Sequence, residues 1–418
     1  MELKKYNANH TQVLKINQIV RTISETHKFD KDKLIAINTS DVENGVMGNG
    51  TLTFVDELKG QFKKTIVKDD ILFSEIRPAN RRFAKVTTKN TKDYVVSTKL
   101  MVLRKYNEDV DLEYFYYCLT NQPFLDILQR RAENRIGSFP QITFDLLSEY
   151  AFPIPPISEQ KRISSVISTL DKKIALNRQI NQNLEAMAKQ FYDYWFVQFD
   201  FPNEEGKPYK SSGGKMVWNE KLKRNIPVGW HCGNLFEIAV FTNGLACQKF
   251  RPKDDEESLP VIKIREMHDG ISDDTEEVTS NIPESVKVYN GDVLFSWSAS
   301  LEVMLWAYGL GGLNQHIFKV TSANDFPKSF YYFQLLDYID VFKKVAEARK
   351  TTMGHITQDH LQQSTIAIPD NKDIADKFEE LISPIFKQIV KLQEEISNFI
   401  KQRDELLPLL MNGQITIE

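Results

Sequence analysis

Cysteine is scarce in this sequence, with only Cys118, Cys232 and Cys247 among the 418 residues. The three are scattered and show no C-x-x-C spacing, which argues against a disulfide framework and against a cysteine zinc site. An apolar leader and a run of about 18 apolar residues, the signals of secretion and membrane insertion, are also missing. We therefore expect a cytoplasmic protein with no membrane contact.

The motifs of the common cofactor-dependent enzymes are missing as well. The sequence contains no H-E-x-x-H pair, no Walker lysine motif, no G-x-G-x-x-G loop after an expected strand and no methyltransferase motif of the N-P-P-Y type. We expect no catalytic residue, no metal and no cofactor in this chain.

An excess of basic residues, which is typical of nucleic-acid binders, is not found either. The net charge is −4 and the isoelectric point is about 6.1. The charge is unevenly distributed, however: segments 75–85 and 129–135 are locally basic, whereas 254–258 and 272–277 are acidic. The chain can therefore still present a positive surface.

What the sequence does contain is an internal repeat. The block "DDILFSEI" (69–76) matches "GDVLFSWS" (291–298), and "YFYYCL" (114–119) matches "FYYFQL" (330–335). A third block, "QITFDLLSEYAFPIP" (141–155), matches "HITQDHLQQSTIAIP" (355–369). The blocks follow one another in the same order, which indicates two copies of one structural unit.

Each copy predicts the same plan. Short runs of β-type residues come first, then the strand "DILFS" or "DVLFS", an aromatic helix, and a last strand that ends at proline. A long segment with heptad spacing follows each copy. We therefore expect an α+β chain: two tandem β-rich domains (1–156 and 226–370), each followed by a long helix (157–198 and 371–418), with a linker at 199–225.

The two long helices are expected to pair as an antiparallel coiled coil, with Ser158 and Asp370 as their N-caps. Asn177 and Asn181 are polar seam positions that either fix the register or lie near solvent or a further partner. The full predicted seam comprises Ile163, Leu170, Ile174, Asn177, Asn181 and Leu184 in the first helix, and Ile382, Ile385, Ile389, Leu392, Ile396 and Phe399 in the second.

Two arrangements could suggest metal chemistry. Asp70 and Glu75 flank an apolar strand, as nuclease carboxylates often do, but the second copy has Trp297 in place of Glu75. His355 and His360 surround Asp359, and the first copy lacks the matching histidines. A turn aspartate explains Asp70 better, because aspartate is common at the entry to a strand.

The loops before the last strand of each copy, 130–143 and 348–359, combine cations, hydroxyl groups, glycine and an amide. Arginine and lysine suit phosphate and guanine, and asparagine and glutamine suit adenine, so these loops are candidates for DNA contact. Arg81 and Arg82 are expected to bind phosphate. All the candidate DNA-binding positions are Arg77, Arg81, Arg82, Lys99, Arg131, Arg135, Ser138, Gln141, Gln248, Arg251, Trp297, Asn314, Gln315, Lys350, Thr351, Thr352 and His355.

At this point a family resemblance is visible. The stretch "FPIPPISEQKRI" (152–163), followed by "ISTLDKKIALNRQINQNLEAMAKQFYDYWF" (167–196), resembles the specificity subunit of type I restriction–modification systems, HsdS. "IPVGW" (226–230) followed by "GNLFEIAVFTNG" (233–244) is similar to the start of that family's recognition domain.

The resemblance implies a non-catalytic subunit with two target-recognition domains, each of which reads one half of a bipartite double-stranded DNA target. It also implies that the helices set the spacing between the halves. Two methyltransferase subunits would dock on the chain, as would two restriction/translocase subunits. Those partners would supply S-adenosylmethionine, ATP and Mg. The alternatives are a structural coiled-coil adaptor and a self-contained metal-dependent nuclease.

Overall fold

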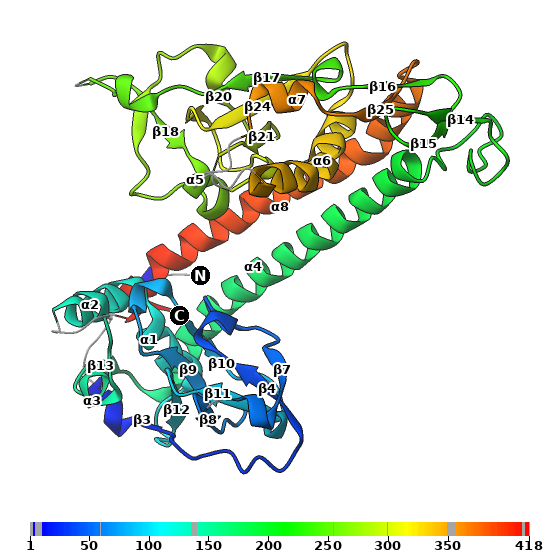
Figure 1. Cartoon of the computed structure of the whole chain (residues 1–418). Helices are drawn as coiled ribbons and strands as arrows, with labels where there is room; N and C mark the ends of the chain where they lie inside the picture. Colours follow the sequence, from blue (N-terminus) through cyan, green and yellow to red (C-terminus); the bar gives the residue numbers. More distant parts are fainter. Residues whose placement is uncertain are drawn as a thin grey trace. The chain divides into compact units, whose positions relative to one another are not determined.

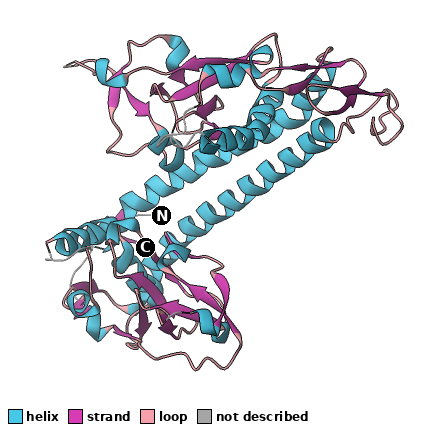
Figure 2. Cartoon of the chain, in the orientation of Figure 1, coloured by secondary structure: helices cyan, strands magenta, loops and turns pink. Residues whose placement is uncertain are grey.

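Figure 1 shows the computed structural model of the chain, and it describes residues 3–4, 11–58, 60–134, 140–253, 255–298, 300–348, 356–411 and 414–417. The chain divides into two compact units. Unit 1 comprises Met1–Lys172 and Ile400–Glu418, and unit 2 comprises Lys173–Phe399. Each unit contains one copy of the repeat and a part of both long helices, whose cyan coils stand out from the magenta strands in Figure 2.

Unit 1 contains two four-stranded sheets. The first is antiparallel throughout and has the order β10 (Phe83–Lys85), β9 (Ile71–Ser74), β12 (Leu100–Lys105), β3 (Val20–Thr22). The second has the order β7 (Thr51–Phe54), β4 (Lys33–Ile37), β11 (Tyr94–Ser97), β8 (Phe62–Lys64), and only β4 and β11 are parallel. The smaller pairs are β13 (Ala151–Ile154) with β2 (Gln12–Lys15), β5 (Val42–Glu43) with β6 (Val46–Met47), and β1 (Leu3–Lys4) with β26 (Thr416–Ile417).

Unit 2 repeats this topology. Its antiparallel sheet has the order β22 (Glu302–Leu305), β21 (Val293–Ser296), β24 (Ile317–Ser322), β17 (Ala239–Asn243). Its second sheet has the order β19 (Glu277–Thr279), β18 (Ser258–Ile262), β23 (Gly311–Leu313), β20 (Lys287–Val288), again with one parallel pair, β18 and β23. The pair β16 (Trp230–Gly233) and β25 (Ile366–Pro369) corresponds to β2 and β13. The duplication predicted from the sequence is thus present in the strand order.

The repeated block "ILFS" or "VLFS" is apolar at every position because its strand is covered on both faces. Successive side chains of a strand point to opposite faces. In β9, Ile71 and Phe73 enter the core beneath the helices, while Leu72 enters the core shared with the second sheet. In β21, Phe295 and Leu294 divide in the same way.

The aromatic helix differs between the copies. In unit 1 it is broken into α1 (Leu112–Thr120) and α2 (Gln122–Glu133), whereas in unit 2 it is a single helix, α6 (Lys328–Ala348). The break occurs at Asn121, whose side chain accepts a hydrogen bond from the Phe124 N–H at the start of α2. Asparagine is a favoured N-cap and proline, here Pro123, is tolerated only in the first turn. The shorter helices are α3 (Phe144–Ser148), α5 (Ile264–Asp269) and α7 (Gln358–Gln362).

The two predicted long helices are α4 (Ile157–Tyr192), which continues into a π-helical turn at Asp193–Val197, and α8 (Asp373–Met411). Their predicted caps are wrong. Ser158 lies inside the first turn of α4, behind two prolines, and Asp370 bonds to His231 instead. The Asp373 N–H at the start of α8 donates to the Asn371 side chain.

Within each unit the helix pair is antiparallel. In unit 2, the Asn177 amide donates to Glu395 (3.0 Å) and the Asn181 amide donates to the Ile389 carbonyl (3.3 Å), so one sequence number rises as the other falls. In unit 1, Arg403 of α8 and Tyr117 of α1 both donate to the Asp171 carboxylate of α4. The predicted seam residues are all buried or half-buried.

Segment 199–225, expected to be a linker, is folded into unit 2. Phe199 and Phe201 are buried, and their rings lie 5.4 and 5.7 Å from that of Trp230. A hairpin of β14 (Met216–Asn219) and β15 (Arg224–Pro227) crosses the expected domain boundary at residue 226.

Candidate nucleic-acid interface

The same three-way backbone junction is built at the end of the repeated strand in both units. In unit 1, Glu75 follows β9; its N–H donates to the Lys99 carbonyl (3.1 Å) and its carbonyl accepts from the Ile142 N–H (2.7 Å). In unit 2, Trp297 follows β21 and makes the equivalent bonds with His316 (3.3 Å) and Ile356 (3.0 Å). We name these junction 1 and junction 2.

Junction 1 brings polar and basic side chains together from three separate segments. The Gln141 side chain donates to the Glu75 carboxylate (2.8 Å), and the Arg77 N–H donates to the Pro140 carbonyl (3.1 Å). The Arg77 and Lys99 side chains are exposed beside this pair. The structure therefore presents a carboxylate, an amide and two cations at one place.

Junction 2 has the same frame but different side chains. The Trp297 indole N–H donates to the Asn243 side chain (3.3 Å), and the Trp297 ring lies 5.5 Å from the His316 ring. Gln315 and His316 are half-buried neighbours whose side-chain nitrogens lie 3.4 Å apart. An indole, an imidazole and two amides thus stand where junction 1 has charged groups.

The comparisons with known proteins now decide the family. Residues 10–186 and 227–404 both match the family described as the type I restriction modification DNA specificity domain. The chain belongs to this family.

Similar proteins span nearly the whole chain. The HindI specificity subunit of Haemophilus influenzae is 28% identical over 460 residues, which cover 96% of this chain and 98% of that protein. The MjaIX specificity subunit of Methanocaldococcus jannaschii is 24% identical over 315 residues, covering 73% and 69%. The crystal structure of a type I restriction–modification S subunit from M. genitalium aligns with a TM-score of 0.56 at 15% identity over 98% of each chain, and this likeness concerns the fold alone.

Both residues that are predicted to bind phosphate, Arg81 and Arg82, make polar contacts within unit 1. The Arg81 guanidinium donates to the side chains of Asn44 (2.7 Å) and Gln122 (2.5 Å), and burial lowers its pKa. Arg82 contacts the Ser40 carbonyl and the Glu43 carboxylate. Arg81 is therefore half-buried and already hydrogen-bonded within unit 1, whereas the Arg77 side chain is exposed, and phosphate binding by Arg81 and Arg82 stays a prediction.

The remaining candidates are spread more widely. Arg131 is exposed on α2, and Gln248 and Arg251 line an open pocket of about 400 Å³ in the second specificity domain. Asn314 is buried, and its side chain accepts a hydrogen bond from the His316 N–H (3.3 Å). This bond fixes the backbone of His316, a residue of junction 2. The candidates Arg135, Ser138, Lys350, Thr351, Thr352 and His355 lie outside the residues that the structure describes.

Sequence reasoning missed three residues of these junctions. Asn243 and His316 in the second specificity domain were not singled out, although His316 directly follows two candidates. Lys64 was also missed; its ammonium group donates to the carbonyls of Thr98 (3.1 Å) and Leu100 (2.7 Å), which holds the loop that carries Lys99. Burial lowers the Lys64 pKa.

The nuclease alternative finds no support at Asp70. The Asp70 carboxylate is only 1% exposed, accepts two hydrogen bonds from the Arg104 guanidinium (2.8 Å each) and a third from the Val67 N–H (2.7 Å). In the second specificity domain, Asp292 likewise accepts from the Tyr289 N–H and pairs with Lys319. Both aspartates hold the turn that leads into the repeated strand.

We expect Asp70→Asn to destabilise the first specificity domain by about 2 kcal/mol, because it weakens charge-assisted hydrogen bonds to a buried group. All five tryptophans lie in unit 2, so the measurement is hydrogen exchange of the β9 amides rather than fluorescence. Asp69→Asn, at the exposed neighbouring position, is the control and should leave exchange unchanged. Equal exchange in both variants would contradict the structural role of Asp70.

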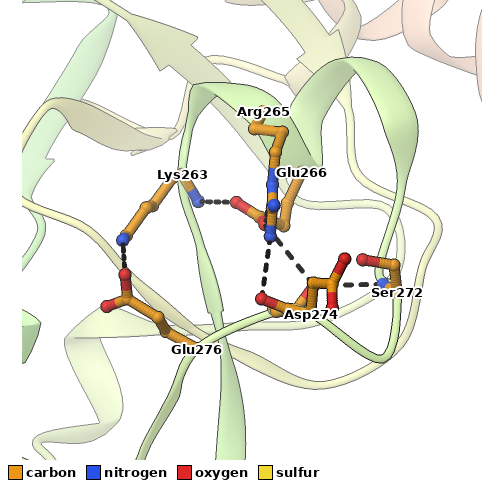
Figure 3. Close-up of polar contacts among 7 residues, drawn as sticks. Lys263, Arg265, Glu266, Ser272, Asp274 and Glu276 are labelled. Carbon is orange, nitrogen blue, oxygen red and sulfur yellow. Dashed lines mark hydrogen bonds and ion pairs between the residues drawn. The ribbon is translucent and has the colours of Figure 1, made fainter. Parts of the chain in front are cut away.

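A second buried carboxylate, Glu266, is likewise structural (Figure 3). It is 1% exposed and accepts hydrogen bonds from the Arg265 guanidinium (2.9 and 2.7 Å) and from the Lys263 N–H (3.1 Å). Arg265 also donates to the Asp274 carbonyl, and Lys263 forms an ion pair with Glu276. These contacts tie the start of α5 to segment 272–276.

Neither a membrane-spanning helix nor a metal-ligand cluster is present in the part of the chain that the structure describes. No helix of that part is long and apolar enough to cross a membrane. Nor does that part contain a group of three or more His, Cys, Asp or Glu side chains placed to hold a metal ion.

Proposed function

We propose that this chain is the DNA-specificity subunit of a type I restriction–modification complex, and that each specificity domain reads one half of a bipartite target. The family membership of both halves of the chain supports the general role. In this role the chain binds DNA and performs no chemistry itself.

The observation that carries the proposal is the difference between the two junctions. One backbone frame holds Glu75, Gln141 and Lys99 in unit 1, and Trp297, His316 and Asn243 in unit 2. Carboxylates accept hydrogen bonds from cytosine, amides suit adenine, and cations suit guanine or phosphate. A duplicated scaffold with different side chains at the same place is what reading two different half-sites requires.

We further propose that α4 and α8 form the scaffold for two methyltransferase subunits and set the distance between the half-sites. Apolar side chains on these helices support a docking role: Leu176 is 55% exposed, and Met187 and Leu381 are also exposed. Scattered exposed apolar residues on long helices are suitable for burial by a partner. Two restriction/translocase subunits would complete the complex, and the partners would supply S-adenosylmethionine, ATP and Mg.

The test of this function is methylation mapping. The chain is expressed with a type I methyltransferase subunit from its own source, in cells that lack other adenine methylation. We expect methylated adenines within a bipartite motif that has a fixed unread spacer, and none when this chain is omitted. Methylation of the same sites without the chain, or no site-specific methylation with it, would overturn the proposal.

Arg77 and Arg81 offer a matched comparison for DNA binding. If Arg77 contacts phosphate, Arg77→Ala should weaken binding to all sequences and reduce the slope of log affinity against log salt by about 1. Arg81→Ala should instead lower the stability of unit 1, because Arg81 bonds Asn44 and Gln122, and leave the salt slope unchanged. Binding titrations at several salt concentrations, with a thermal unfolding scan of each variant, measure both effects. The opposite pattern would restore Arg81 as the phosphate contact.

A further inference from the structure

Unit 2 contains a cavity of about 320 Å³ that the proposed DNA-reading role does not use. It lies where α4, α8, α6 and β22 meet, and it is separate from the residues of junction 2. In Figure 1, α6 runs along α8, and the Tyr332 and Phe386 rings of these two helices are 5.1 Å apart. The site is therefore built by four packed elements rather than by a surface loop.

The lining combines apolar walls with acceptor atoms. Val303, Leu336 and Phe386 contribute the apolar part. The Asn181 side chain is 7% exposed, and its amide nitrogen donates a hydrogen bond to the Ile389 carbonyl. Its amide oxygen, Oδ1, has no hydrogen-bond partner among the described residues. A buried acceptor without a donor is unfavourable, so a donor from a ligand would be stabilising.

Two carboxylates add negative charge to the same cavity. Glu302 Oε2 is buried and lies 3.3 Å from His268 Nδ1, without hydrogen-bond geometry. Glu185 lies on the α4 side of the cavity, at its solvent-exposed edge. The lining residues that the structure describes include no lysine or arginine. The cavity thus offers three oxygen acceptors, two of them on carboxylates that suit a cationic donor, and the hydroxyl groups of Tyr308 and Tyr332 also line it.

We propose that this cavity binds an alkylammonium ligand, a small aliphatic amine whose charged end meets Asn181, Glu185 and Glu302 and whose methylene chain lies against the apolar wall. An ammonium group carries three donors and no acceptor, which matches the three oxygen acceptors of Asn181, Glu185 and Glu302. An inorganic cation would leave the apolar wall unused. Such a ligand would brace α4 against α8 and the second specificity domain.

The probe is 1,5-diaminopentane, titrated by calorimetry into the full chain in the complex with which it purifies, with DNA absent because amines also bind phosphate. The matched control ligand is 1,5-pentanediol, which has the same chain length without charge. We expect saturable binding of the diamine at one site per chain, and none of the diol. No binding of the diamine, or equal binding of both compounds, would overturn the proposal.

Three variants test whether the heat of diamine binding comes from this cavity. Glu185→Gln, at an exposed position where folding is not at risk, should weaken diamine binding about tenfold or more, as should Asn181→Leu. Glu380→Gln removes the same charge from an exposed position of α8 outside the lining and should bind like the unmodified chain. Equal affinity of the Glu185 and Glu380 variants would place the amine elsewhere and reject the assignment.

Discussion

His316→Ala is expected to weaken recognition of one half-site and to leave the other unchanged. A base contact contributes about 1–3 kcal/mol of discrimination, and each 1.4 kcal/mol is a factor of ten in affinity. The reason is the position of His316 in junction 2, beside Trp297 and apart from the contacts that hold the core of unit 2. In junction 1, Lys99→Ala should affect the opposite half-site, because Lys99 is exposed at the equivalent point of the frame.

The measurement is methylation of a DNA library in which one half-site at a time is randomised. The controls are His268→Ala in unit 2 and Lys89→Ala in unit 1, which remove the same groups outside the junctions. The double variant His316→Ala with Lys99→Ala should show the sum of both losses, since the two junctions belong to separate compact units and share no residue, and independent sites are additive. If either single variant relaxed both half-sites, the assignment of one half-site to each unit would be wrong.

The sequence was sufficient for the parts of the fold that depend on local pattern. The repeated blocks predicted two copies of one unit, and the strand orders of the two units agree with that. Heptad spacing predicted the two long helices, which the structure has at Ile157–Tyr192 and Asp373–Met411. Both signals lie in stretches whose core-facing positions follow a regular pattern: every position of the repeated strands β9 and β21, and two in seven of the long helices.

The junctions could not be predicted, because they join segments that are far apart in the chain. Glu75 meets Lys99 and Gln141 only after β9 and β12 have paired, and no sequence spacing records that meeting. The N-caps failed for a related reason: Pro155 and Pro156 let α4 begin at Ile157 without Ser158, and Asp370 is taken by His231. The hydrogen bonds of Arg81 to Asn44 and Gln122 could not be foreseen either, because these residues lie 37 and 41 positions away in the sequence.

Lengthening both long helices together should lengthen the unread spacer of the DNA target and leave the half-site sequences unchanged. A four-residue helical insertion after Lys172 in α4, matched by one after Phe399 in α8, falls at the boundary between the two units. It leaves the Asp171–Arg403 contact of unit 1 and the Asn177–Glu395 contact of unit 2 intact. The insertion adds about 6 Å along each helix, and B-DNA rises about 3.4 Å per base pair. We therefore expect a spacer that is longer by one or two base pairs.

The control is an insertion in α4 alone, after the same Lys172. It shifts α4 against α8 between those two contacts, so the heptad repeat of α4 is interrupted by four residues while that of α8 is not. We therefore expect lower stability and little methylation. Four residues also slightly exceed one turn of 3.6, and each added base pair rotates the DNA, so only some insert lengths should restore activity. The measurement is methylation-site mapping in cells that also contain the methyltransferase. An active paired variant with an unchanged spacer would reject the helices as the spacing element, whereas altered half-sites would reject the two specificity domains as the readers of sequence.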